Sequence, residues 1–383
     1  MEWIQGLAPA GLLVWVIILL LPWRPWSTRE SLDAGKNHTD TDLSGITVLI
    51  PARNEAPVIA QTLQALARQC RDLPIIVVDD QSTDDTARIV GNLSLPNLVL
   101  VHGEPTPPGW SGKLWALEQA RTRAKTDLML LLDADIELAP GLVATLKKKL
   151  LETNTHLLSL MARLRMNSVW ELLLIPAFIY FFKLLYPFAL SNRGSRYVSA
   201  AAGGCILLRA RSLDAIGGFA ALKNAIIDDC TLARCFRKHG YRTWIGLTHT
   251  AVSLRAYHDL AGIWHMVTRT AFTQLRFSLL LLGLCTVMMF VAFLVPVLNT
   301  VMSQGWPRWL GLATLPVMFA TYAPVLRYYG IPIVWSLSLP VAGTLYLVMT
   351  WHSALNHMSG RGAVWKGRAY GKLSTTVTET TRR

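Results

Sequence analysis

Charged residues are scarce in this chain: they make up 16% of its 383 residues, whereas 52% are hydrophobic. This composition is too apolar for an ordinary soluble protein. The middle of the sequence nevertheless carries too many charges for a bundle made only of membrane spans. The sequence therefore predicts one soluble domain joined to several membrane-spanning segments.

Cysteine is also rare, and its few positions form no pattern. The five cysteines show no spacing typical of metal ligands; they are Cys70, Cys205, Cys230, Cys235 and Cys285. An odd and scattered set excludes a disulfide framework and fits reduced thiols in the cytosol.

Acidic residues are the minority among the charges, with 24 Asp and Glu against 37 Lys and Arg and a net charge of +13. The basic residues flank apolar segments: Arg24, Arg29 and Lys36 follow the first one, and six Lys or Arg follow Gly360. Basic flanks mark the cytoplasmic side of a membrane and attract anionic lipids. We therefore expect a membrane partner and no nucleic acid, with the soluble domain and the basic tail, 357–383, in the cytoplasm.

Long uncharged runs predict the spans. Residues 3–23 carry no charge, and neither a preceding Lys or Arg nor a cleavage site points to a signal peptide, so 1–23 is predicted to be an anchor. Residues 277–356 form the predicted C-terminal membrane region. Within it, 277–306 and 328–356 are long enough to span, while 309–326 is shorter and contains Pro316 and Pro324. We expect 309–326 to be re-entrant or tilted, since three full spans would place the basic tail outside.

The segments between these runs have different characters. Residues 24–44 and 256–276 are predicted to be linkers, the second one interfacial. Residues 169–190 are aromatic and Leu-rich, but Glu171, Lys183 and two prolines interrupt them. This pattern favours helices lying in the membrane interface. A buried core helix pair is the alternative.

The soluble region, 45–255, predicts an open α/β sheet. Apolar runs at 46–50, 75–78 and Leu128–Leu132 each end in polar residues and alternate with helix-like segments such as 56–69 and 84–91. Continuous apolar runs suit parallel strands buried on both faces, and ligands bind at the carboxyl ends of such strands. Asp133 and Asp135 follow one run and share a face if the strand geometry continues. They predict a site for Mg²⁺ or Mn²⁺ completed by phosphate oxygens; a polar loop or helix cap is the alternative.

The ordered set "PARNE", "VVDDQSTDDT", "GKLWAL", "LLDADIE", "GGC", "IGGF" and "IDDCTLA" resembles the family-2 inverting glycosyltransferases, over residues 45–250. The N-terminal anchor, "PPGWSGKLWA" and "WKGRAY" are most similar to the branch encoded with hopanoid-lipid biosynthesis genes in bacteria. The resemblance implies a GT-A fold, a nucleotide-sugar donor and a lipid acceptor. It also implies a multi-pass protein of the bacterial inner membrane with a cytoplasmic catalytic domain.

The resemblance also assigns roles to residues. Asp135 is implied as the direct metal ligand with Asp133 beside it, and Asp229 as the catalytic base with Asp228 as its neighbour. The implied donor site comprises Pro51, Ala52, Arg53, Glu55, Asp80, Lys113, Asp133 and Arg269. The implied acceptor site comprises Gly203, Gly204 and Cys205. The chain departs from the family pattern at Gln81, where glycine is frequent, and it lacks the usual Gln-x-x-Arg-Trp element.

Physical arguments support two of these roles and leave alternatives open. Lys113 follows Gly112 at a predicted helix start, where charge and free N–H groups attract anions; a solvated lysine is the alternative. Asp228 and Asp229 can differ in pKa, so that one serves as base; an acidic helix start is the alternative. A processive polysaccharide synthase, a nucleotidyltransferase and a non-catalytic scaffold are the competing functions.

Overall fold

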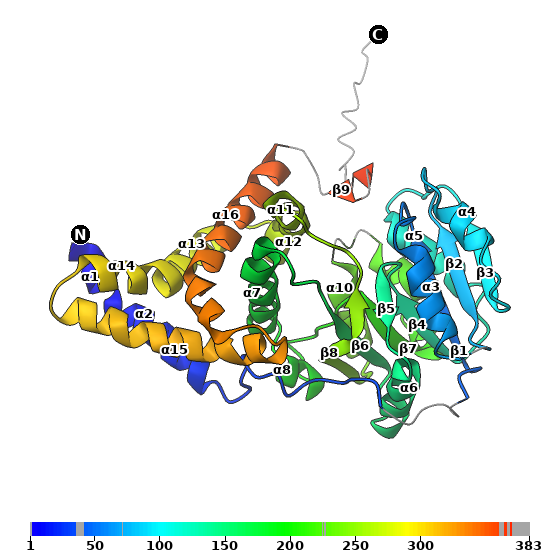
Figure 1. Ribbon diagram of the computed structural model, residues 1–383, viewed down its shortest axis with the longest axis horizontal. Helices are drawn as coiled ribbons and strands as arrows, with labels where there is room; N and C mark the ends of the chain where they lie inside the picture. Colours follow the sequence, from blue (N-terminus) through cyan, green and yellow to red (C-terminus); the bar gives the residue numbers. More distant parts are fainter. Residues whose placement is uncertain are drawn as a thin grey trace, which may run out of the picture.

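The protein has two unlike halves, an α/β domain and a set of long apolar helices (Figure 1). The structure is a computed structural model, and it describes residues 2–35, 42–70, 72–223, 225, 227–359, 364–365 and 368–369. In Figure 1 the α/β domain lies on the right, and helices α2, α14 and α15 extend away from it to the left.

The α/β domain is built on a mixed sheet of eight strands within the described residues. Its order is β3-β2-β1-β4-β7-β6-β8-β5. The strands are β1 (Ile46–Ala52), β2 (Ile75–Asp79), β3 (Leu98–His102), β4 (Leu128–Leu132), β5 (Ile136–Leu138), β6 (Leu157–Arg163), β7 (Cys205–Arg209) and β8 (Thr243–Ser253).

Strands β1, β2 and β4 confirm the three apolar runs read from the sequence. Every residue of these strands is buried, as expected for strands covered by helices on both faces. The helices that follow them agree with the sequence within a few residues; they are α3 (Ile59–Ala67), α4 (Thr86–Gly91), α5 (Gly112–Arg121) and α6 (Leu142–Glu152).

Strands β6, β7 and β8 bring further strand ends to the same edge of the sheet. Strand β7 runs antiparallel to both β4 and β6, and β6 runs parallel to β8. The carboxyl ends of β1, β2, β4, β6 and β8 therefore meet the amino end of β7 at a single edge. Helix α10 (Asp228–Lys238) packs beside this half of the sheet, and α9 (Ala210–Ala215) follows β7 at the opposite edge.

The segment 169–190 forms α7 (Val169–Leu185) and the short α8 (Phe188–Asn192). A capping box starts α7: Ser168 Oγ accepts from the Glu171 N–H, and Glu171 accepts from the Ser168 N–H. Tyr180 Oη lies 2.8 Å from Thr321 Oγ1, and Tyr346 Oη donates to the Leu174 carbonyl. Helix α7 is therefore packed against α15 (Trp306–Tyr328) and α16 (Leu339–Met358), which supports the buried-helix alternative.

The predicted linker 24–44 does not run freely between the two halves. Ser31 forms a β-bridge with Leu247, and the Leu247 N–H donates to the Glu30 carbonyl. The Asp33 carboxylate accepts from the His249 N–H and from Thr248 Oγ1. Residues 30–33 are thus attached to β8 by backbone hydrogen bonds and by the Asp33 side chain, which composition alone does not reveal.

Four described helical segments are long and apolar enough to cross a membrane: Glu2–Leu20, Leu279–Met302, Trp306–Tyr328 and Ile333–Met358. The first comprises α1 (Glu2–Gly6) and α2 (Ala8–Leu20); the second comprises α13 (Leu279–Met289), η2 (Phe290–Leu294) and α14 (Val295–Met302). The re-entrant alternative for 309–326 is corrected, because α15 is one continuous 23-residue helix despite Pro316 and Pro324; the tilted alternative stays a prediction. Most of the predicted basic tail, 357–383, lies outside the described residues.

Candidate active site

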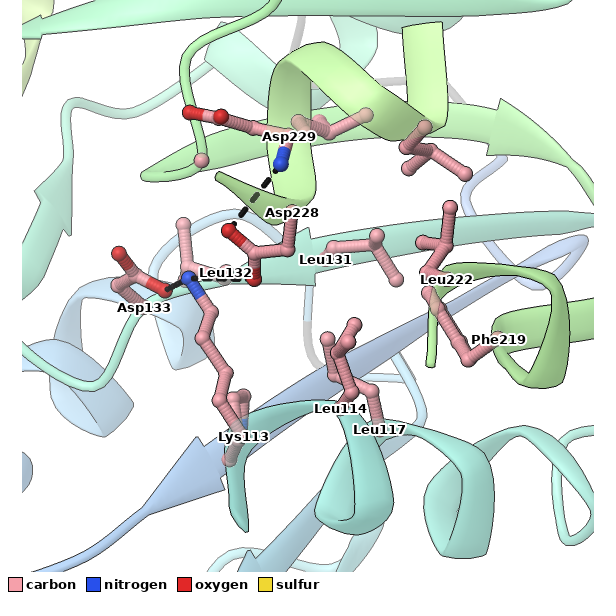
Figure 2. A pocket seen from close by; sticks show the side chains of 14 residues that line it. Lys113, Leu114, Leu117, Leu131, Leu132, Asp133, Phe219, Leu222, Asp228 and Asp229 are labelled. Carbon is pink, nitrogen blue, oxygen red and sulfur yellow. Dashed lines mark hydrogen bonds and ion pairs between the residues drawn. The ribbon is translucent and has the colours of Figure 1, made fainter. Parts of the chain in front are cut away.

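Five chain segments meet in a pocket at the shared edge of the sheet (Figure 2). Lys113 comes from the first turn of α5, Asp133 from the end of β4, Gly203 from the turn before β7, and Asp228 and Asp229 from the start of α10. Pro51 of β1 also lines the pocket. The fold thus brings together residues that lie up to about 180 positions apart in the sequence.

Lys113 joins the acidic groups of this pocket. Its Nζ lies 2.7 Å from Asp133 Oδ1 and 3.9 Å from Asp228 Oδ2, and Figure 2 shows it between the two carboxylates. Burial alone would lower the pKa of Lys113, but the neighbouring carboxylates raise it well above its usual value. The lysine is therefore a fixed cation among carboxylates, and the alternative of a solvated surface lysine does not hold.

Asp229 has the protonation behaviour of a base that works near neutral pH. Burial, and then the negative charge of Asp228, raise the pKa of Asp229 to about 7. N–H groups of Cys230 and Gly203 donate to its carboxylate and limit the rise. Asp228 Oδ1 instead accepts from the Asp229 N–H. The adjacent carboxylates thus have unlike surroundings, and Asp229 can exchange a proton near pH 7.

The predicted acceptor residues separate into pocket and core. A Cβ on Gly203 would lie 3.3 Å from Lys113 Nζ and 3.5 Å from Asp229 Oδ2, so a side chain there would crowd both groups. Gly204 adjoins Ile136 and Ala162. Cys205 is a correction: it begins β7, its side chain is fully buried in the hydrophobic core, and it does not line the pocket.

Asp135 lies in a second charged cluster beside the first. Arg255 Nε donates to Asp135 Oδ2 at 3.1 Å, and Arg255 Nη2 donates to Glu55 Oε1 at 3.0 Å. Ser253 Oγ donates to the same Asp135 oxygen at 3.2 Å. Sequence reasoning missed Arg255, whose only signal is its position just after the last apolar strand of the domain.

The carboxylates of Asp133 and Asp135 can hold a divalent cation together with a substrate. Within the described residues, each carboxylate uses one oxygen in ion pairs, Oδ1 of Asp133 and Oδ2 of Asp135, so the other oxygen of each is available. Mg²⁺ is commonly held by one or two carboxylates plus substrate phosphates. The described part of the chain has no cluster of three or more His, Cys, Asp or Glu suited to a metal. The donor set therefore fits a cation shared with a diphosphate.

The loop after β2 is held by hydrogen bonds with Ala52 and Arg53, at the end of β1. Arg53 Nη1 donates to the Asp80 and Gln81 carbonyls at 2.5 and 2.9 Å, and the Asp80 N–H donates to the Ala52 carbonyl. Gln81 has φ of +56°, a left-handed conformation that glycine adopts more easily. The departure from the family pattern at Gln81 therefore leaves the expected loop shape intact.

Arg269 lies at the end of α11 (Leu260–Thr268) and does not line the pocket of Lys113 and Asp229. Burial raises the pKa of Tyr257, and the nearby Arg255 and Arg269 oppose the rise, while Asp135 adds to it. The electrostatic coupling places Tyr257 among Arg255, Arg269 and Asp135. Arg269 thus lies within electrostatic range of Tyr257, and no side-chain hydrogen bond fixes it within the described residues.

Residues 47–217, slightly under half of the chain, match the family model "Glycosyl transferase family 2". This segment contains β1, β2, β4, Lys113 and the Asp133–Asp135 pair. The mixed sheet with a carboxylate pair after β4 is the GT-A fold that the resemblance implied. The family model thus matches most of the α/β domain, which is similar to family 2 glycosyltransferases.

The similar proteins agree with this assignment. Two are named 4,4'-diaponeurosporenoate glycosyltransferase: the chain is 30% identical to the Staphylococcus haemolyticus protein over 113 residues and 35% identical to the Staphylococcus aureus protein over 91 residues. These matches cover 30% and 24% of this chain, and the same shares of the relatives. The chain thus spans less than a third of the length of these relatives.

A solved structure resembles nearly the whole chain. It is a mannosyltransferase from Pyrobaculum calidifontis, determined in complex with GDP-mannose and Mn²⁺. The similarity covers 92% of this chain and 99% of that one, with a TM-score of 0.55 and 19% sequence identity. At this identity the likeness establishes the fold, including the apolar helices beside the α/β domain.

Proposed function

We propose that the protein transfers a sugar, with inversion, from a nucleoside-diphosphate donor to a membrane lipid. The observation that carries the proposal is the single pocket in which Lys113 and Asp133 face Asp228 and Asp229. Such a pocket combines a cation for a diphosphate with a carboxylate that can accept a proton.

The residues of the pocket divide the chemistry between them. Asp229 accepts the proton of the attacking hydroxyl, because its pKa of about 7 lets it do so near neutral pH. Gly203 leaves room for the hydroxyl beside Asp229. Lys113 exchanges Asp133 for the incoming diphosphate and neutralises the charge that grows on the leaving group.

Asp135 and Asp133 would hold Mg²⁺ or Mn²⁺, which supplies Lewis-acid neutralisation of the nucleoside diphosphate when bound. Arg255 keeps the Asp135 carboxylate oriented toward the sheet edge and pairs with Glu55. Glu55, Asp80 and the backbone of Pro51 and Ala52 form the wall for the nucleoside.

The apolar helices and the relatives support a lipid acceptor. Four described segments are suited to a membrane. The staphylococcal relatives are named for diaponeurosporenoate, a carotenoid acid and thus a terpenoid. We extend this to a terpenoid lipid acceptor, of which a hopanoid is one candidate; no finding singles out a hopanoid within that class. The proposed location is the bacterial inner membrane, with the catalytic domain in the cytoplasm.

A donor screen tests the proposal. The full chain in detergent is incubated with Mn²⁺ and a panel of UDP- and GDP-sugars, with or without a bacterial lipid extract, and released UDP or GDP is measured. One donor should give release that the extract stimulates, together with a glycolipid product. If no donor binds or turns over, the proposed function is wrong.

A further inference from the structure

A second cavity, of about 480 Å³, lies between the sheet edge and the apolar helices. Its walls are the turn from β6 to α7 (163–167), the end of β8 (252–254) and the loop after α15 (329–332). Its volume is within the range of small-molecule sites in proteins. The cavity thus joins the catalytic edge to the segment that follows a candidate membrane helix.

The cavity carries polar groups that no other described residue satisfies. Neither Arg163 nor Arg165 forms a side-chain hydrogen bond or an ion pair with a described residue. Tyr329 is 5% exposed, and its hydroxyl is buried without a hydrogen-bond partner in the described structure. Buried hydroxyls almost always have a partner. Glu171, at the start of α7, is not one of the cavity residues, and its carboxylate accepts from three backbone N–H groups.

Apolar side chains also line the cavity, with Leu164, Met166, Leu172, Leu254 and Ile331 among them. Leu172 lies in α7, and Ile331 follows α15, so both apolar helices contribute to the wall. The lining therefore offers contacts for hydrocarbon as well as for oxygen atoms. This combination suits an amphipathic molecule.

The cavity adjoins the Asp135 cluster of the active site and shares strand β6 with the neighbourhood of Gly204. Ser253 lines it and donates a hydrogen bond to Asp135 Oδ2. On the other side, a Cβ on Gly204 would lie 3.6 Å from the Cβ of Ala162, next to Arg163, and Gly203 lies beside Asp229. An oxygen-bearing head in this cavity therefore lies beside the strand end that carries Ser253, the partner of Asp135.

We propose that this cavity binds the lipid acceptor, and that Arg163 and Tyr329 position its head by hydrogen bonds to oxygen atoms. The inference rests on the proposed transfer to a lipid, and it adds the place where the lipid binds and the chemical groups that the lipid must have. All candidate lipids have an apolar chain with hydrogen-bond-accepting oxygens at one end, in a hydroxyl, a carboxylate or a phosphate. Arg163 offers several donors and remains charged, so it can hold any of these heads.

Protection of an introduced thiol tests the site directly. Met166→Cys, or Leu254→Cys as a second reporter, is made in the full chain and reacted with a maleimide, and labelling at that position is followed by mass spectrometry. The probes share one isoprenoid chain: farnesol, farnesoic acid, farnesyl monophosphate and the hydrocarbon farnesene. At least one oxygenated probe should slow labelling, and farnesene should not.

Variants of Arg163 then identify the head. Arg163→Ala should weaken protection about tenfold, as expected for loss of a charged hydrogen-bond donor. Arg163→Gln keeps a neutral donor, so it should retain protection by an alcohol and lose protection by a carboxylate or a phosphate. The control is Arg211→Ala, which removes an exposed arginine on α9 at the far edge of the sheet and should change nothing.

Three results would overturn the inference: no probe protects either reporter, farnesene protects as well as the oxygenated probes, or Arg163→Ala leaves protection unchanged. Calorimetry with UDP or GDP and Mn²⁺ separates this from the proposed function. Arg163→Ala should bind the nucleotide normally, whereas Asp135→Ala should not. Absence of nucleotide binding by the unaltered chain would refute the sugar transfer, whatever the thiol experiment shows.

Discussion

Asp229 and Asp135 are both carboxylates at the same edge of the sheet, yet their partners differ. Asp229 is held by N–H groups of Cys230 and Gly203 and by its position near Asp228. Asp135 is held by Arg255 and Ser253. The first environment favours proton exchange, and the second fixes an ionised group that can bind a cation. This difference should separate catalysis from donor binding.

Asp229→Asn should lower turnover by about 10²–10⁴-fold, because an amide cannot accept the proton that general-base catalysis removes. Its donor affinity, measured by calorimetry with Mn²⁺, should change little. Asp135→Asn should show the reverse order, with donor affinity falling first. If Asp229→Asn weakens donor binding as much as turnover, Asp229 is a binding group and Asp228 becomes the candidate base.

The pH dependence of kcat/KM should report the same carboxylate. With a pKa of about 7, Asp229 is ionised above neutral pH, so the rate should level off there and fall about tenfold per unit at lower pH. The negative charge of Asp228 contributes to the raised pKa, so Asp228→Asn should move the inflection to lower pH. An inflection that stays in place in Asp228→Asn but disappears in another carboxylate variant would reassign the base.

The sequence predicted the residues of the site better than their partners. Lys113, Asp133, Asp135 and Asp229 each lie at an apolar strand end or a helix start, as predicted, and the structure brings them to one edge of the sheet, while their roles stay predictions. Arg255 was missed because its contact with Asp135 spans 120 positions, and no local pattern encodes such a pair. Cys205 was misassigned because alternation along β7 turns its side chain into the core.

Among the elements, the parallel strands were predictable and the later strands were not. β1, β2 and β4 are continuous apolar runs, a pattern that indicates parallel strands buried on both faces. β6, β7 and β8 are separated by α7 and α10, and their order in the sheet depends on contacts made over long sequence distances. The burial of α7 likewise depends on α15 and α16, which follow it by more than a hundred residues.

Helix α7 contains a buried charge that its packing has to accommodate. Lys183 is 1% exposed, its Nζ lies 3.7 Å from Glu30 Oε2, and it sits 3.9 Å from the centre of the Phe188 ring. Burial lowers the pKa of Lys183 to about 8. The folded state therefore binds this proton less tightly than the unfolded chain, in which lysine has a pKa of about 10.4.

Lys183→Met should raise the free energy of unfolding at pH 7 by about 1–3 kcal/mol, because an apolar side chain of similar length replaces a buried ion. The advantage should shrink as the pH rises from about 8 to 10, since the unfolded lysine then binds more protons and the unaltered protein gains stability. Glu30→Gln, the matched variant, should be destabilising. Thermal unfolding in detergent at several pH values measures the stability of the unaltered protein and of both variants. A stability advantage of Lys183→Met that grows with pH would contradict the burial argument.

At the scale of the whole molecule, α16 differs from the other apolar helices in its direction. Helices α2, α14 and α15 extend away from the α/β domain, whereas α16 runs beside α7 along the boundary between the two halves (Figure 1). Near its end, Ser353 Oγ donates to the Thr268 carbonyl, and the His357 ring stacks on Phe277 at 4.3 Å. Both of these partners belong to segments that connect the domain to α13.

The start of α16 also lies near the domain. The preceding loop lines the cavity with Arg163, and His249 Nε2 of β8 lies 2.7 Å from the Tyr328 carbonyl at the end of α15. Only η3 (Ile333–Ser338) separates that loop from α16. A 20-residue helix is about 30 Å long. A helix with both ends near one side of the membrane lies along the interface and does not cross it.

We therefore expect three crossings, with the residues after α16 on the same side as the α/β domain. Three full spans after the domain would place the basic tail on the opposite side of the membrane from the domain. If α16 does not cross, two C-terminal spans remain and the tail returns to the side of the domain, so the segment that does not cross is α16 and not 309–326.

Single cysteines at Arg211, Gln304 and Ser359 test this topology in sealed membrane vesicles of both orientations. The first two mark the domain and the exposed loop between α14 and α15. An impermeant maleimide should label Ser359→Cys together with Arg211→Cys, and Gln304→Cys only from the other side. Labelling of Ser359→Cys together with Gln304→Cys would show instead that α16 crosses the bilayer.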